Sequence, residues 1–105
     1  MKNLDSIAVR IQHLDLEIIK NWLIRQKGWS QSYADQMEML YKRFLIMRIR
    51  FPDSNILSTT ATEEMWNAHL RHTKKYVLDF TYIFSRDTDF SDEDFYKAQR
   101  LYKVV

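Results

Sequence analysis

The sequence contains no cysteine, one glycine and one proline in 105 residues. Without cysteine the chain can form neither a disulfide nor a thiolate metal site. A single glycine and a single proline are too few for the many tight turns of a β-sandwich, because these residues dominate such turns. The shortage therefore favours long helices, and the lack of cysteine is compatible with a cytoplasmic protein.

Long apolar runs and a strong net charge are also missing. No stretch reaches the ~20 apolar residues of a membrane-spanning helix, and acids interrupt the apolar residues of the opening segment MKNLDSIAVRIQHLD, unlike in a signal peptide. The formal net charge of +2 does not by itself imply a nucleic-acid partner. Hydrophobic residues make up 46% of the chain, so we expect one folded, cytoplasmic domain over residues 1–105. The use of lysine, isoleucine and asparagine favours a bacterial or phage source.

The segment from Thr60 to Phe84 has the apolar spacing of one long helix. Spacings of three and four place these residues on one face: Met65, His69, His72, Tyr76, Phe80 and Ile83. A second row lies beside it: Trp66, Leu70, Thr73, Val77 and Phe84. Two adjacent rows give a wide buried arc, which is typical of a central helix. Thr60 and Glu63 are expected to form the capping box at its start.

Shorter helices are expected on both sides of this segment. Gly28 directly follows a basic turn, which is typical of a helix end. Ser30 is expected to cap the next helix, which should run to about Arg50, shortly before Pro52. A last helix is expected after Ser91.

The N-terminal part leaves two alternatives open. Residues 4–13 and the segment after Leu14 are either two helices, the second capped by Asp15, or one bent helix. In both cases the sequence predicts an all-α fold, a compact bundle of four to five helices around the long central helix.

Two of the three histidines lie one turn apart on the central helix. The spacing of His69 and His72 can bind a metal. No carboxylate stands three or four residues from either, so a further ligand would have to come from His13 or from an acid on another helix. We therefore expect no metal site, and two partly buried histidines bonded to backbone or tyrosine groups.

The motifs of nucleophilic catalysis are absent. The sequence has no cysteine, no G-x-S-x-G motif and no glycine-rich phosphate loop. The acids from Asp92 to Asp94 occupy an expected first turn, where the helix dipole favours them. We therefore expect no catalytic residue, no cofactor and no enzymatic activity.

Basic residues gather in two expected helices: Lys42, Arg43, Arg48 and Arg50 in one, and Arg71, Lys74 and Lys75 in the other. They would form one positive face if these helices lay side by side, which would fit a nucleic acid. The alternative is a solvated surface, because 14 acids accompany the 16 lysines and arginines.

Aromatic residues favour protein binding. The chain has three tryptophans, six tyrosines, six phenylalanines and five methionines, more than a small core needs. Large aromatic side chains anchor interfaces, so Trp22, Trp29 and Trp66 are candidates for exposure, unless all three belong to the core. Trp29, next to the single glycine, is the one most expected to be partly exposed.

The segment from Trp22 to Phe84 resembles the small helical domain of the glycine-rich-domain-containing proteins. Bacterial members read roughly Y-R-R-F-L, then a proline turn, then D-x-x-W-H-x-H-I-x-x-T-x-x-Y. The matching residues here are Tyr41, Arg43, Phe44, Leu45, Trp66, His69, Leu70, Thr73 and Tyr76. The segment Gly28-Trp29-Ser30 also resembles the one that precedes Y-R-R-F-L in the family.

The chain departs from this family at several positions. Asn67 replaces the first histidine, Glu63 or Glu64 matches the family's acid loosely, and a cysteine near Phe80 is absent. SRDTDF replaces the family's H-H-x-P. If those histidines bind a metal in relatives, this chain has lost most of the set. The family has no well-defined activity, so the resemblance implies a helical fold more than a function.

The function that the sequence favours is a non-catalytic protein-interaction module, an adaptor or inhibitor of a partner protein. The interaction candidates are Trp29, Trp66, His69, His72, Tyr76, Arg43, Lys74 and Lys75. The alternatives are a nucleic-acid-binding helical domain, which would use the basic residues, and a metal-dependent enzyme, which would use the histidines.

Overall fold

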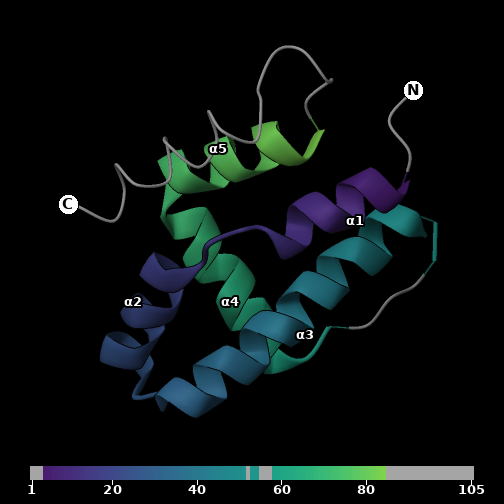
Figure 1. The fold of residues 1–105 in the computed structure, drawn as a ribbon. Helices are drawn as coiled ribbons and strands as arrows, with labels where there is room; N and C mark the ends of the chain where they lie inside the picture. Colours follow the sequence, from purple (N-terminus) through teal and green to yellow (C-terminus); the bar gives the residue numbers. More distant parts are fainter. Residues whose placement is uncertain (1–3, 52, 55–57, 85–105) are drawn as a thin grey trace.

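The computed structural model describes residues 4–51, 53–54 and 58–84, in which it forms five α-helices and no strand (Figure 1). The helices are α1 (Leu4–Gln12), α2 (Glu17–Lys27), α3 (Gln31–Arg50), α4 (Thr60–Arg71) and α5 (Thr73–Phe84). The predicted all-α bundle is confirmed, while Pro52 and the helix expected after Ser91 lie outside the described residues. Over the described ranges, no helix combines the length and apolarity needed to cross a membrane.

The longest helix, α3, packs against α1, α2 and α4. α4 also contacts α2 and α5, and α5 contacts α1. In Figure 1, α5 lies at the top of the bundle and α3 at the bottom, with α1 and α4 between them. The bundle is therefore organised around α3 and α4 rather than around one helix from residue 60 to residue 84.

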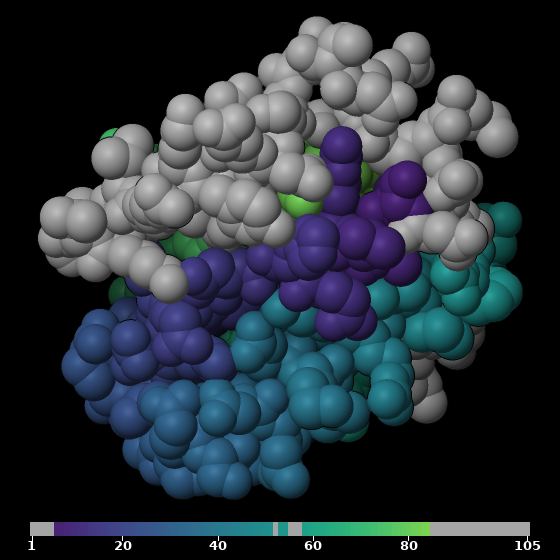
Figure 2. Space-filling view, viewed as in Figure 1, coloured from purple at the N-terminus to yellow at the C-terminus, as the bar shows by residue number. Residues whose placement is uncertain are grey.

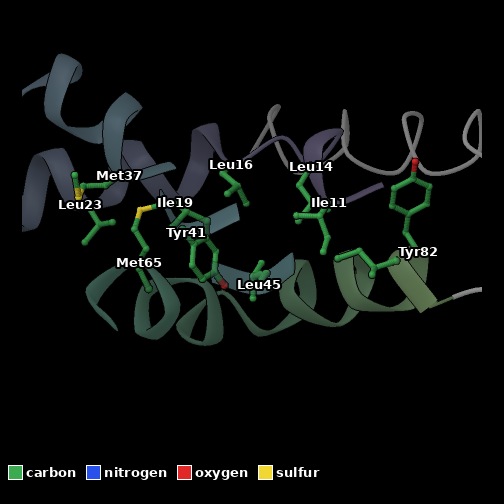
Figure 3. Packing of buried hydrophobic residues seen from close by; sticks show 12 residues of the cluster. Ile11, Leu14, Leu16, Ile19, Leu23, Met37, Tyr41, Leu45, Met65 and Tyr82 are labelled. Atoms are coloured by element: carbon green, nitrogen blue, oxygen red, sulfur yellow. The ribbon is translucent and has the colours of Figure 1, made fainter. Parts of the chain in front are cut away.

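Each of the five described helices contributes side chains to one hydrophobic core. Its buried members are Ile11, Leu14, Leu16, Ile19, Leu23, Met37, Tyr41, Leu45, Met65, Ala68, Tyr82 and Ile83. Figure 3 shows Ile11, Leu14 and Leu16 pointing from the purple ribbon of the N-terminal segments toward the green ribbon of α4 and α5. Burying apolar surface at about 25 cal/mol per Å² makes this cluster the main favourable contribution to folding.

The helix boundaries predicted at Gly28 and Ser30 are confirmed. Gly28 ends α2 in the left-handed conformation, with φ 71°, and Ser30 Oγ accepts a hydrogen bond from the Tyr33 N–H at 3.0 Å at the start of α3. α1 and α2 are separate helices. The Asp15 carboxylate accepts a hydrogen bond from the Glu17 N–H at 3.0 Å, although the N-cap position itself is Leu16.

The prediction of one continuous helix from Thr60 to Phe84 is wrong. The backbone leaves the helical region at His72, with φ −88° and ψ 69°. In a straight helix, His69 and Asp79 would stand about 15 Å apart along the axis, because each residue adds 1.5 Å. Their side chains are 2.7 Å apart, which the bend makes possible.

Two further predictions for residues 60–84 are wrong. Thr59 rather than Thr60 caps α4, since Thr59 Oγ1 accepts a hydrogen bond from the Thr62 N–H at 3.1 Å. The second apolar row is not buried as a unit: Leu70, Val77 and Phe84 are exposed. Because α5 is oriented independently of α4, it buries a different face: Lys75, Asp79, Tyr82 and Ile83.

Candidate functional site

Four polar side chains from three helices form a hydrogen-bonded chain inside the bundle. The Tyr41 hydroxyl lies 2.8 Å from His69 Nδ1, and His69 Nε2 lies 2.7 Å from Asp79 Oδ2. The Lys75 ammonium donates to both Asp79 oxygens, at 3.0 and 2.9 Å. Tyr41, His69 and Asp79 are 0% exposed and Lys75 is 3% exposed. The network thus ties α3, α4 and α5 together out of contact with water.

The donors and acceptors of this network satisfy one another with a neutral histidine. If the Tyr41 hydroxyl donates to Nδ1, the Nε2–H of His69 is free to donate to the Asp79 carboxylate, and this assignment follows from the hydrogen-bond partners. Burial raises the pKa of the Tyr41 hydroxyl, and the nearby Tyr76 and Asp79 act in the same direction. Tyr41 therefore stays protonated and remains a donor.

A tyrosine–histidine–aspartate chain has the group types for proton transfer, but here it has no access to a substrate. The Tyr76 ring covers one edge of the His69 ring at 5.2 Å between centroids, and the Phe80 ring lies at 5.9 Å. A general base must come within hydrogen-bond reach of the proton that it abstracts. Because both ring nitrogens of His69 have partners, the network acts as a structural element of the core.

The two histidines have the tyrosine and backbone partners that the sequence predicted, but His69 is fully rather than partly buried and also pairs with Asp79. His69 Nδ1 bonds to the Tyr41 hydroxyl, and His72 Nδ1 donates a hydrogen bond to the Ala68 carbonyl at 2.8 Å, because a carbonyl oxygen can only accept. Over the described residues, no group of three or more histidines, cysteines or acids is placed to hold a metal ion. Asp79 was missed as the third partner, although the opposite charges of Lys75 and Asp79 at a spacing of four were a readable signal.

Two lysines assigned to a positive face are instead buried. Lys75 was expected to face water, but it is paired with Asp79 in the core. Lys42 is 7% exposed, and its ammonium donates to the carbonyls of Gln12 and Leu14 at 3.0 and 2.8 Å and pairs with Glu38 at 3.1 Å. Long lysine side chains can reach such partners from a position that a helical wheel places at the surface.

Lys20 is a third buried lysine, which the sequence did not single out. Its ammonium pairs with Glu17, Asp35 and Glu38 at 2.8 to 3.0 Å. Burial works to lower the pKa of Lys20, but the hydrogen bonds to these acids outweigh it, and the pKa is raised overall. Asp35 and Glu38, the two acids of α3, are therefore both paired with a lysine of α2, although the Asp35 side chain remains 55% exposed.

The other interaction candidates divide into packed aromatics and exposed cations. Trp29 is half-buried against the Tyr33 ring at 4.8 Å, which agrees with its expected partial exposure. Trp66 is half-buried beside Phe44, and its indole N–H is buried with no hydrogen-bond partner in the described part of the chain.

Tyr76 is half-buried between the rings of His69 and Phe80. Arg43 and Lys74 are exposed. They lie on different helices, since Arg43 belongs to α3 and Lys74 to α5, which packs against α1 and α4.

Exposed apolar side chains are concentrated on α3. Among the large hydrophobic residues that face solvent in the described part of the chain, five belong to this helix and its C-cap: Tyr33 (38%), Met39 (67%), Leu40 (39%), Met47 (37%) and Phe51 (44%). The remaining four are spread over α1, α4 and α5: Val9, Leu70, Val77 and Phe84. We call Tyr33, Met39, Leu40, Arg43, Met47 and Phe51 the outer face of α3.

Two hollows flank this face, and Arg43 and Met47 line both. The larger, of about 400 Å³, lies between α3 and the end of α1 and is lined by Gln12, Met39, Arg43, Ile46, Met47 and Arg50. The smaller, of about 210 Å³, is lined by Leu40, Arg43, Phe44, Met47, Ser58, Thr59 and Thr62. Figure 2 shows the blue-to-teal atoms of α3 at the surface beside the purple atoms of α1.

The charge of this surface is positive. Residues 39–50 of α3 contain Lys42, Arg43, Arg48 and Arg50 and no acid. Because Lys42 is buried, the arginines supply the exposed charge. Tyr33, Leu40 and Met47 stand seven residues apart on α3, and this spacing is the sequence signal that indicates an apolar row on one side of the helix.

Comparison with known proteins adds no family: no family model, curated protein or solved structure matches the chain. The resemblance to the glycine-rich-domain-containing proteins therefore stays a prediction. The function has to be argued from the buried network and from the outer face of α3.

Proposed function

We propose that this protein is a non-catalytic interaction module, an adaptor or inhibitor, that binds another protein through the outer face of α3. The observation that carries the proposal is the grouping of exposed Met39, Leu40, Met47 and Phe51 around Arg43 on one helix. Aromatic residues, methionine and arginine are the residue types enriched at protein interfaces, where lysine and acids are depleted. We also infer a cytoplasmic location, because the chain has no cysteine.

The exposure of these side chains supports binding rather than folding. A methionine that is 67% exposed contributes little to the core, whereas burial in a complex would remove its apolar surface from water. Single exposed apolar residues are common, but a contiguous group on one helix is typical of an interaction site. The hollows beside Arg43 and Met47 give such a partner places to insert side chains.

The burial of the polar network supports a non-catalytic role. The imidazole of His69 and the carboxylate of Asp79 are 0% exposed. Acid–base catalysis needs these groups beside a substrate, and reaching them would require α3, α4 and α5 to separate.

Nucleic acid is the less favoured ligand. Lys42 and Lys75 already neutralise acids inside the protein. Met39 and Met47, which flank Arg43 on the exposed helix, would lose contact with water without gaining an apolar partner on a phosphate backbone.

The proposal is tested by comparing three versions of the protein in pull-downs from native-host lysate. The variant Met39→Glu places a charge on the outer face of α3, and Val77→Glu places the same charge on α5 at a similarly exposed position, 57% against 67%. Each pull-down is run with and without nuclease. The wild type and Val77→Glu should retain one protein in near-stoichiometric amount, and Met39→Glu should lose it.

Two results would contradict the proposal. Equal retention by Met39→Glu and the wild type would show that the outer face of α3 is not the binding surface. Loss of the retained material on nuclease treatment would move the assignment to nucleic-acid binding.

A further inference from the structure

We infer that the partner binds the outer face of α3 with an acidic amphipathic helix, an inference that rests on the proposed function. It adds the chemistry of the partner: apolar anchors along one stripe, with aspartate or glutamate beside them. The shape of the larger hollow, the charge around it and the side chains that line it each support this occupant.

The shape of the larger hollow fits a helix. Its lining runs along α3 from Met39 to Arg50, twelve residues whose eleven steps of about 1.5 Å each span about 16 Å. This length corresponds to about three turns of a partner helix. Packing of a helix into the groove beside another helix is a common recognition mode, in which anchors at i, i+3 or i+4, and i+7 enter the groove.

The charge around the hollow selects acids. Arg43 is exposed and forms no ion pair with any residue that the structure describes. Arg50 lines the same hollow seven residues further along, about 10 Å away along the axis of α3. A carboxylate on a partner helix would pair with the Arg43 guanidinium, because guanidinium groups bind carboxylates in a two-pronged geometry.

The acids of α3 do not oppose such a partner. Asp35 and Glu38 are hydrogen-bonded to Lys20, and the Lys20 and Gln31 hydrogen bonds hold the pKa of Asp35 below its usual range. Their charge is thus compensated beside α2. A basic helix would instead meet uncompensated positive charge at Arg43, so the surface discriminates by sign as well as by shape.

The apolar lining accepts anchors of several shapes. Met39 and Met47 are unbranched and flexible, so they adapt to leucine, isoleucine or phenylalanine side chains. Ile46 also lines the hollow, and it is half-buried and packed against the core, so its side chain is held more rigidly than those of the two methionines. The hollow therefore specifies an apolar stripe rather than one residue.

The inference is tested by selecting peptides on the full-length protein. The probe is a displayed library of helical sixteen-residue peptides with an alanine-based frame and random residues on one face and its flanks. The selected peptides should carry large apolar residues at helical spacing next to aspartate or glutamate. Their affinity should fall about tenfold or more for Arg43→Glu and stay unchanged for Arg25→Glu, an exposed arginine on α2. Peptides with the acids changed to lysine should bind Arg43→Glu better than they bind the wild type.

The results separate this inference from the proposed function. If the selected peptides bind the outer face of α3 but carry no acids, or carry bases, the inference of an acidic partner helix is refuted. The proposal that this face is the binding surface is then still supported. Selected peptides whose affinity is unchanged by both Met39→Glu and Arg43→Glu place binding elsewhere and overturn both. Failure to enrich any peptide overturns the inference, while the pull-down comparison still decides the proposed function.

Discussion

Within residues 4–84, as far as the structure describes them, three lysines are buried, and each is paired with acids or carbonyls. Lys20 pairs with three carboxylates, Lys42 with Glu38 and two carbonyls, and Lys75 with Asp79. Lysine is almost never fully buried unless it is paired, because an unpaired ammonium in the interior is costly. The stability of the bundle therefore depends on individual charged residues as well as on its apolar core.

Replacing Asp79 by asparagine should be strongly destabilising. The change keeps the size of the side chain but removes the carboxylate charge that lies 2.9 Å from the Lys75 ammonium, which is 3% exposed. Breaking a buried pair in this way costs about 3–5 kcal/mol of unfolding free energy. Urea denaturation measures the loss, with Lys74→Ala as the control, since a change at an exposed lysine should stay within about 0.5 kcal/mol. A cost for Asp79→Asn no larger than that of the control would contradict the assigned ion pair.

Alkaline pH should weaken the fold through Tyr41. Burial, followed by the nearby Tyr76 and Asp79, raises the pKa of this hydroxyl in the folded protein. In the unfolded chain a tyrosine ionises near pH 10, so above that pH the unfolded state releases a proton that the folded state keeps. The contribution is fully present below about pH 10 and is lost as the pH rises toward the folded pKa. The raised pKa of Lys20 acts in the same direction.

The variant Tyr41→Phe isolates the tyrosine contribution. It should be less stable than the wild type at pH 8, because the hydrogen bond to His69 is lost, and its stability should fall less steeply between about pH 10 and 11. Tyr33→Phe changes an exposed tyrosine and should keep the wild-type slope. Urea titrations at several pH values give the slopes, and identical slopes for Tyr41→Phe and the wild type would refute the account.

At the level of helices, the sequence predicted the boundaries that depend on local chemistry. Gly28 ends α2 through its own left-handed backbone conformation, and Ser30 caps α3 through its own hydroxyl. Both roles can therefore be predicted without knowledge of the fold. The break at His72 has no glycine or proline nearby that would predict it from the sequence. It is accompanied by a contact between His69 and Asp79, which are ten residues apart, and a tertiary contact of this kind does not appear in a helical periodicity.

A double-mutant cycle tests the bend between α4 and α5. His69→Gln and Asp79→Asn are made singly and together, and the unfolding free energies are compared. Side chains in contact couple by about 0.5–3 kcal/mol, whereas residues about 15 Å apart in a straight helix should be additive. Coupling within that range is expected here, because the two side chains are 2.7 Å apart. Additivity within experimental error would support the straight helix instead.

For the whole molecule, the sequence predicted an excess of aromatic and methionine side chains over what the core needs, but not where on the surface they would lie. The sequence indicated more aromatic and methionine residues than a core needs, and this pointed to a binding surface. It favoured Trp29 and Trp66 as anchors, but both are half-buried against the core. The exposed group instead lies on α3, since that helix packs on three others and still has one side turned to solvent. Which side remains open depends on the arrangement of all five helices.

The position of the basic residues could not be predicted from the sequence either. Seven basic residues could be assigned to one face from the helical spacing, but Lys42 and Lys75 are used inside the bundle. Arg43 keeps its charge at the surface, among methionines. The number of basic residues in the sequence is therefore larger than the number that a nucleic acid could contact at the surface.

The most direct test of the central claim is site-specific photo-crosslinking. The photoreactive residue p-benzoylphenylalanine is incorporated in place of Met47 on α3 or, as a control, in place of Gln26 on the exposed side of α2, and the protein is irradiated in lysate from its native host. The account predicts one discrete crosslinked protein from position 47, with none from position 26, and an acidic amphipathic helix in the crosslinked segment. The same product from both positions, or a product from position 26 alone, would contradict a binding surface on α3.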